Sequence, residues 1–178
     1  MPDADAMPTL VHGTCLDIEE TGILILGPPG SGKSDLALRL IDAPGHGLGA
    51  DIARASLVAD DQVLLRRDGG GVVASAPALL AGLIEVRGIG ILKADYRRRS
   101  RLGLIVRLVP VADIERLPEP LELREELLGI GLPSIRIDPR LASAPARLRA
   151  GLQALSGPAF PARLTISTEE LRCPAPAD

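Results

Sequence analysis

An eight-residue stretch near the N-terminus has the residue types and spacing of a phosphate-binding loop. It matches the pattern G-x-x-x-x-G-K-[ST] and reads Gly27-Pro28-Pro29-Gly30-Ser31-Gly32-Lys33-Ser34. In such a P-loop the glycines let backbone N–H groups converge on phosphate oxygens, the lysine reaches the β- and γ-phosphates, and the last hydroxyl can bind Mg²⁺. A glycine-rich turn could fit by chance, but the chain's own composition gives only about 10⁻³ chance matches. Residues 27–34, called the glycine loop below, therefore predict a nucleotide- or phosphate-binding site.

A pair of carboxylates follows a short apolar run further along the chain. Asp60 and Asp61 come directly after residues 57–59, which we predict to be a strand. Because α/β folds place ligand chemistry at the carboxyl ends of strands, either aspartate could hold Mg²⁺ or take a proton beside the loop. Two close carboxylates repel, which raises the proton affinity of one and suits it to acid–base chemistry. The alternative is a strand that ends in a solvated acidic turn.

Three further side chains could belong to the same site. Glu85 and Arg87 interrupt the otherwise apolar run 83–92. A lone charge is costly to bury, so we expect these two to pair with each other or to meet a metal rather than form a surface ladder. His12 lies on a predicted strand beside the glycine loop, a position in which histidine is more often structural than catalytic.

Apolar patterning predicts the elements that position these residues. The run 23–26 predicts a strand before the glycine loop, and apolar residues at helical spacing in 36–41 predict a helix after it. A strand over 10–18 and a turn at 19–22 would form a hairpin that leads into the loop.

The rest of the chain gives weaker signals. We predict a hairpin from 63–66 and 72–75, a strand over 104–110 and a helix over about 144–155. The arginine-rich run 97–101 is typical of a solvated turn. No clear period appears over 121–131.

Composition limits the domain organisation. With 178 residues and 46% hydrophobic content, the chain can bury one core. We predict a lead-in over 1–9, one α/β domain with a mixed sheet and a P-loop over 10–155, and a proline-rich tail over 156–178.

Composition also limits the partners. The aromatic content of 1%, the net charge of −3 and the pI near 5.5 argue against nucleic acid, which favours stacking platforms and a basic surface. We expect no membrane partner and a cytoplasmic protein, because no run approaches the roughly 20 apolar residues of a membrane span and the N-terminus is acidic.

Several separated pieces together resemble the catalytic domain of bacterial HPr kinase/phosphorylase over about 10–155. They are His12-Gly13, the glycine loop, residues 57–61 and the run Ile84-Glu85-Val86-Arg87-Gly88-Ile89-Gly90-Ile91. The last run is the most specific, because ordinary P-loop kinases have nothing like it. The resemblance implies a fold similar to phosphoenolpyruvate carboxykinase and a homohexamer. It also implies ATP- and Mg²⁺-dependent phosphorylation of a serine of the phosphocarrier protein HPr, and removal of that phosphate by phosphorolysis to pyrophosphate.

The same resemblance implies roles for individual residues. Lys33 would contact nucleotide phosphates, and Ser34 and Glu85 would bind Mg²⁺. Asp61, the second aspartate of the pair, would be the acid–base group, and His12 would be a further active-site residue.

Other positions match the family less completely. Arg116 resembles its separate active-site arginine, and Arg140 resembles the end of a loop used in dephosphorylation. Residues 135–140 lack the Gly-Arg-Asn of that loop, so we expect weaker phosphorolysis. Residues 42–56 look longer than the segment that links the helix to the next strand in the family. The resemblance is to the short form associated with alphaproteobacteria, which lacks the family's usual N-terminal regulatory domain, so we expect a different mode of control.

Two alternatives remain open from the sequence. One is a small-molecule or carboxykinase-like phosphotransferase that kept the loop but changed its acceptor. The other is a nucleotide-sensing regulatory module without turnover. Retention of Asp61 and Glu85 beside Lys33 favours an enzyme over a sensor.

Overall fold

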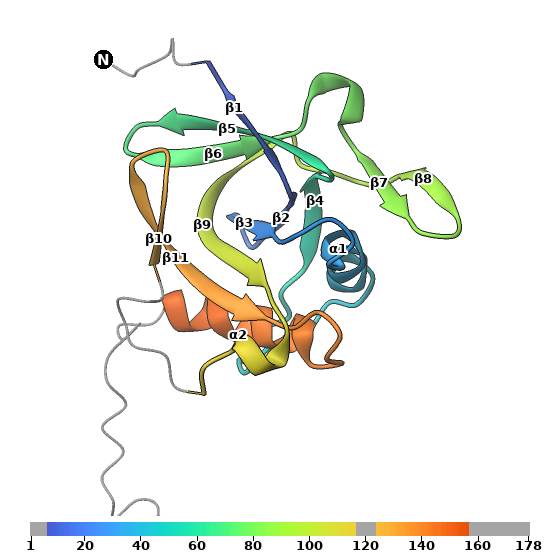
Figure 1. Ribbon diagram of the computed structural model, residues 1–178, viewed down its shortest axis with the longest axis vertical. Helices are drawn as coiled ribbons and strands as arrows, with labels where there is room; N and C mark the ends of the chain where they lie inside the picture. The colour runs from blue at the N-terminus through green and yellow to red at the C-terminus, as the bar shows by residue number, and fades with distance from the viewer. Residues whose placement is uncertain (1–6, 117–123, 157–178) are drawn as a thin grey trace, which may run out of the picture.

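A curled mixed β-sheet with two α-helices against it forms the body of the protein (Figure 1), in a computed structural model that describes residues 7–116 and 124–156. The predicted mixed α/β class is confirmed. The elements in chain order are β1 Thr9–His12, β2 Thr14–Ile18, β3 Thr21–Leu26, α1 Lys33–Asp42, β4 Ala55–Ala59, β5 Gln62–Asp68, β6 Gly71–Ser75, the 3₁₀ turn Ala78–Leu80, β7 Leu83–Val86, β8 Gly90–Lys93, β9 Arg99–Leu108, the 3₁₀ turn Val111–Asp113, β10 Arg124–Leu127, β11 Ile130–Ile137 and α2 Ala144–Ser156.

Strand β9 organises the sheet because three other strands pair with it. It runs parallel to β3 along one edge; on the other edge it pairs first with β6, antiparallel, and then with β11, parallel. The order β1-β5-β6-β9-β3-β2-β4, with β11 and then β10 branching from β9, gives a sheet of nine strands. The carboxyl ends of β3, β9 and β11 therefore meet at one edge, where α/β folds commonly bind ligands.

The core lies on both faces of this curled sheet. Along β3, Ile23 and Ile25 pack with α1 and α2, while Leu24 packs into a second cluster with residues of β4, β5 and β6. This alternation follows from the two-residue period of a strand. The strand that leads into the glycine loop is thus buried on both faces and held on both edges, which makes it a rigid base.

Most predicted elements near the glycine loop are confirmed. The strand–loop–helix order appears as β3, residues 27–32 and α1, and the hairpin predicted over 63–75 is β5 and β6. The predicted C-terminal helix is α2. The predicted tail over 156–178 lies outside the described residues except for Ser156, which closes that helix.

Two expectations about elements are wrong, and two strands were not predicted. Residues 10–18 form two strands rather than one, because the chain breaks at Gly13; β1 pairs with β5, and β2 with β3 and β4. The arginine-rich run is not a turn throughout, since β9 begins at Arg99. Strands β10 and β11 occupy much of the region in which no period was visible.

Strands β7 and β8 form a separate hairpin that projects from the body at the right of Figure 1. A buried network anchors the chain between this hairpin and β9. Asp17, 3% exposed, accepts a hydrogen bond from Ser100 Oγ at 2.5 Å and pairs with Arg97 Nε at 3.1 Å. The Arg97 backbone N–H also donates to Leu57 O. The base of the hairpin is therefore tied to the central strands.

Both helices are short. Helix α1 has 10 residues and α2 has 13, and no helix within residues 7–116 and 124–156 is long and apolar enough to cross a membrane.

Candidate active site

The glycine loop joins the end of β3 to the start of α1 by a tight path that needs glycine at specific points. A Cβ at Gly27 would lie 2.7 Å from Ser31 Oγ and 3.1 Å from Leu108 Cβ, so a larger residue would force these neighbours to shift. Gly30 and Gly32 have φ of 75° and 92°, a left-handed backbone that other residues rarely adopt. Helix α1 begins directly after Gly32, so its first N–H groups have no partner within the helix and favour an anion there.

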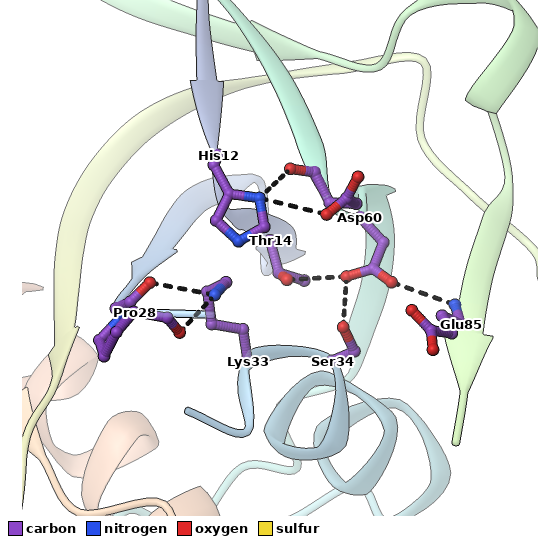
Figure 2. Close-up of polar contacts among 9 residues, drawn as sticks. His12, Thr14, Pro28, Lys33, Ser34, Asp60 and Glu85 are labelled. Atoms are coloured by element: carbon purple, nitrogen blue, oxygen red, sulfur yellow. Dashed lines mark hydrogen bonds and ion pairs between the residues drawn. The ribbon is translucent and has the colours of Figure 1, made fainter. Parts of the chain in front are cut away.

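Lys33 reaches back from the first turn of α1 over the glycine loop. Its ammonium donates to the carbonyl oxygens of Gly27 and Pro28, both at 3.0 Å, as Figure 2 shows. The side chain is largely buried. Burial lowers the pKa of Lys33 from its usual value, and the carboxylates of Asp61 and Asp60 act in the opposite direction. The ammonium thus lies against the glycine loop, where it contacts two carbonyl oxygens of the loop.

Asp60 is a buried hub of hydrogen bonds. Its Oδ1 accepts from Thr14 Oγ1 at 2.7 Å and from Ser34 Oγ at 2.8 Å, and its Oδ2 accepts from the backbone N–H of Glu85 at 3.1 Å (Figure 2). The residue is only 5% exposed. One carboxylate therefore connects three elements: β2 through Thr14, α1 through Ser34 and the β7–β8 hairpin through Glu85.

Asp61 points to a different neighbour. His12 Nδ1 lies 3.0 Å from Asp61 O and 3.1 Å from Asp61 Oδ1, so a proton on Nδ1 can be donated to either oxygen. Gly13 N–H also donates to Asp61 O, which ties the break between β1 and β2 to this residue. Asp61 has a φ of 65°, and its side chain is 63% exposed. Its carboxylate is thus oriented by His12 but remains open to an incoming molecule.

A cavity of about 420 Å³ gathers most of the predicted site residues. Its wall comes from β1, the glycine loop, α1, the end of β4 and the β7–β8 hairpin, and includes the predicted side chains His12, Lys33, Ser34, Asp61, Glu85 and Arg87. Glu85 and Arg87 are both exposed, so burial does not force them to pair: they lie on a hairpin with one face open to solvent. The other alternative, that they meet a metal, stays a prediction.

The other predicted residues lie elsewhere. Arg116 lies at the end of the first described range and does not line this cavity. Arg140 lines a second cavity beside the glycine loop. Within the described residues, no cluster of three or more His, Cys, Asp or Glu side chains could hold a metal by itself. A metal here would need the Ser34 hydroxyl or oxygens from a bound ligand.

Thr14 is a site residue that sequence reasoning missed. It is fully buried, and its hydroxyl holds Asp60 Oδ1. A threonine in an apolar strand gives no local signal of this contact, because its partner lies 46 positions away.

Replacement of Thr14 should therefore destabilise the fold. Thr14→Val keeps the shape but removes a hydrogen bond to a buried carboxylate, and we expect a loss of about 1–3 kcal/mol in the free energy of unfolding. Thr14→Ser, which keeps the hydroxyl, is the matched control and should lose distinctly less. Urea denaturation of the three proteins measures this, and equal stability of Thr14→Val and the parent protein would contradict it.

Comparison with known proteins identifies what this chain is similar to. The family model described as HPr Serine kinase C-terminal domain matches residues 4–145. A protein named HPr kinase/phosphorylase from Bordetella pertussis is 41% identical over 143 residues, which cover 74% of this chain and 43% of the relative. One of the same name from Leptothrix cholodnii is 43% identical over 132 residues, covering 67% of this chain and 37% of the relative. The chain thus spans about two fifths of the length of these relatives.

A solved structure agrees with the sequence comparison. The chain matches the structure of the Hpr(Ser) kinase/phosphatase from Coxiella burnetii with a TM-score of 0.66 and 26% sequence identity. The match covers 82% of this chain and 94% of that one. The curled mixed sheet is therefore shared with that protein.

Proposed function

The chain belongs to the HPr serine kinase C-terminal domain family, and from that premise we propose that it is an ATP-using, Mg²⁺-dependent protein kinase. Its substrate would be a serine of the phosphocarrier protein HPr or of an HPr-like protein. The same site would also run the reverse phosphorolysis, more weakly, because residues 135–140 depart from the family's loop.

One observation carries this proposal. A general base candidate (Asp61), a phosphate-binding lysine (Lys33) and two oxygen ligands (Ser34 and Glu85) line a single cavity beside a helix N-terminus. Phosphoryl transfer needs these groups and little else, because catalysis depends on positioning and on stabilising the charge of the phosphoryl group.

The residues present suit both ATP and Mg²⁺. Mg²⁺ prefers oxygen ligands and is commonly shared between one or two protein groups and substrate phosphates. Ser34 and Glu85 would hold it, and Asp60 contacts the Ser34 hydroxyl and the Glu85 backbone directly. When bound, the metal would supply positive charge that neutralises the phosphates. Lys33 would bind phosphate oxygens through the ammonium that now contacts the loop carbonyls.

Asp61 would handle the proton. A serine hydroxyl is a weak nucleophile, and a carboxylate within hydrogen-bond reach can orient it and accept its proton as the phosphoryl group arrives. His12 is suited to hold one carboxylate oxygen at 3.1 Å, which leaves the other free for the hydroxyl. In reverse, the same carboxyl group would return a proton to the leaving serine oxygen.

The exposed carboxylates of Asp61 and Glu85 weigh against the sensor but not against the small-molecule phosphotransferase. A sensor needs the glycine loop and Lys33 but has no use for an open base positioned by a histidine. A small-molecule phosphotransferase would use the same groups, and only the acceptor separates it from the proposed kinase.

The function can be tested directly. The protein should transfer the labelled γ-phosphate of ATP to a serine of an HPr-like protein encoded in the same genome, only with Mg²⁺ present. Nucleotide binding without transfer to any protein or small acceptor would support the sensor instead. Transfer to a small molecule but not to the HPr-like protein would support the other enzyme.

The proposed metal role of Glu85 predicts a specific kinetic change. Glu85→Gln should raise the Mg²⁺ concentration needed for half-maximal rate, because an amide is a poorer ligand than a carboxylate for a hard cation. The backbone N–H that donates to Asp60 is unaffected by this change. Glu126→Gln on β10, also exposed, is the matched control. If Mg²⁺ titrations of the two variants coincide with the parent protein, Glu85 is not a metal ligand.

A further inference from the structure

The β7–β8 hairpin carries a predicted metal ligand, Glu85, on an element with little packing of its own. In the part of the chain that the structure describes, β7 and β8 pair only with each other and form a sheet separate from the main one. Every residue of β8 is exposed, and on β7 only Ile84 is buried in the core. The position of Glu85 therefore depends on the few polar contacts that tie the hairpin to the body.

One of these contacts lies at Glu85 itself. Its backbone N–H donates to Asp60 Oδ2 at 3.1 Å, and Asp60 Oδ1 accepts from Ser34 Oγ at 2.8 Å (Figure 2). This hydrogen bond fixes one point of β7 but leaves the hairpin able to tilt about that point. A second fixed point is needed to set where the Glu85 carboxylate lies relative to the Ser34 hydroxyl.

The second fixed point is the base of the hairpin. There Ala94 N–H donates to Gly82 O at 2.8 Å, and the Tyr96 ring packs so closely that a Cβ at Gly82 would lie 2.7 Å from its Cδ1. Tyr96 also forms a bridge with Leu57 of β4, and Arg97 N–H donates to Leu57 O at 2.7 Å. The two ends of the hairpin are thus joined to each other and to β4.

Asp17 of β2 holds this base from the interior. Its Oδ1 pairs with Arg97 Nε at 3.1 Å and accepts from the backbone N–H of Glu20 at 3.2 Å, while its Oδ2 accepts from Ser100 Oγ at 2.5 Å. Asp17 is 3% exposed, and a buried carboxylate is costly unless a charged partner and hydrogen bonds replace its water. Both oxygens have such partners, so Asp17 fixes where the chain at Arg97 lies.

We propose that Asp17, through Arg97 and the hairpin, is a positioning residue for Glu85 as a Mg²⁺ ligand. This inference rests on the proposed function, because it takes Glu85 to bind the metal. Asp17 lines neither of the two cavities beside the glycine loop, so it acts only by holding the hairpin. Groups that orient a metal ligand from outside typically change metal affinity by about 10- to 100-fold when they are replaced.

The half-exposed side of the ion pair allows a test that spares the core. Arg97→Gln removes the charge but leaves the hydrogen bond from Ser100 to Asp17. It should raise the Mg²⁺ concentration needed for half-maximal ATP binding, measured by calorimetry, by about ten-fold and leave ATP affinity without Mg²⁺ unchanged. Arg98→Gln is the matched control, because Arg98 is exposed and pairs with no carboxylate within the described residues. Asp17→Asn should act in the same direction as Arg97→Gln, which remains decisive if Asp17→Asn does not fold.

A double-mutant cycle shows whether Arg97 acts through Glu85. The effect of Arg97→Gln on the Mg²⁺ dependence should disappear in a Glu85→Gln background, because the ligand that Arg97 positions is then gone. An equal effect of Arg97→Gln in both backgrounds would mean that Arg97 acts by another route, and the proposal would be overturned.

A further measurement needs neither nucleotide nor metal. Amide hydrogen exchange over residues 83–93 should be faster in Arg97→Gln than in the parent protein, while exchange in α1 stays the same, because only the hairpin loses a fixed point. Equal exchange rates in the hairpin of the two proteins would show that the ion pair does not hold it, which also overturns the proposal.

The outcomes separate this proposal from the kinase function. If the changes in Mg²⁺ dependence and exchange occur but no phosphate is transferred to the HPr-like protein, the positioning role is upheld and the kinase function is rejected. If the parent protein transfers phosphate but Arg97→Gln changes neither Mg²⁺ dependence nor exchange, the kinase function is upheld and the positioning role is rejected. ATP binding by the parent protein that does not depend on Mg²⁺ would reject the positioning role as well.

Discussion

Lys33→Ala should reduce phosphoryl transfer below detection, by at least roughly 10³-fold, while the fold stays intact. The ammonium lies on the glycine loop at 3.0 Å from two carbonyl oxygens, where phosphates would take their place. Alanine removes the charge that would stabilise the transferring phosphoryl group, and nothing else in the first turn of α1 replaces it. Transfer of labelled phosphate to the HPr-like protein measures the effect, and circular dichroism checks the fold.

The chain offers a matched control for this experiment. Lys93 is the only other lysine and is exposed on β8, so Lys93→Ala changes the net charge equally without touching the loop. Lys33→Met, which keeps the buried stem, separates loss of charge from loss of packing. Transfer at the parent rate by Lys33→Ala would remove the basis for a phosphate-binding role of the loop.

Asp61→Asn should lower transfer by roughly 10²–10⁴-fold with nucleotide binding retained. Asparagine keeps the shape of the side chain but cannot accept the serine proton. The substitution is also well matched to the backbone, because Asp61 has a φ of 65° and asparagine tolerates this left-handed region better than most residues. Both directions of the proposed reaction should fall together, since one carboxyl group would serve both.

Two measurements distinguish a base from a structural residue at this position. Titration with a fluorescent nucleotide should give similar affinities for Asp61→Asn and the parent protein. Asp61→Ala adds backbone strain to the loss of basicity, so it should be less stable than Asp61→Asn but equally inactive. If Asp61→Asn has lost nucleotide binding instead, the acid–base role must be sought at Asp60 or His12.

Local patterns predicted the elements around the glycine loop because those elements are encoded locally. The apolar run of β3, the glycines and the helical spacing in α1 lie within about 20 residues, so no distant partner was needed. Strand β10 was missed because Arg124–Leu127 has no strand-like pattern. It forms a hairpin with β11, and contacts with other side chains hold it: Glu125 accepts hydrogen bonds from Arg107 of β9 and from Ser134 of β11.

The start of β9 was missed for a related reason. Arg99 and Arg101 are exposed and Ser100 is buried, which is the alternation expected of a strand. All three residues pair with β6. In the sequence the same residues look like a solvated charge run. Only the pairing with β6 and the buried Asp17 makes this segment a strand, and neither is visible locally.

The candidate site, too, could be predicted only in part from local sequence. Motif matching named His12, Lys33, Ser34, Asp61 and Glu85, and the fold brings all five to one cavity. It could not reveal that Asp60 and Thr14 form the buried link beneath them, because that link depends on the register of β2 with β4. The roles of these residues remain predictions.

The position of β9 has a consequence for how the protein is made. Its parallel pairing with β3 joins Ile23 to Leu104, about 80 positions apart, and such distant contacts are slow to form because a long loop must close first. During synthesis, β2 and β3 are made before β9. One edge of β3 can then pair with β2, but the other edge stays unpaired until β9 has been made. An apolar strand with an open edge is a template for pairing with other chains. Any fragment that ends before Arg99 therefore carries that exposed edge directly next to the glycine loop.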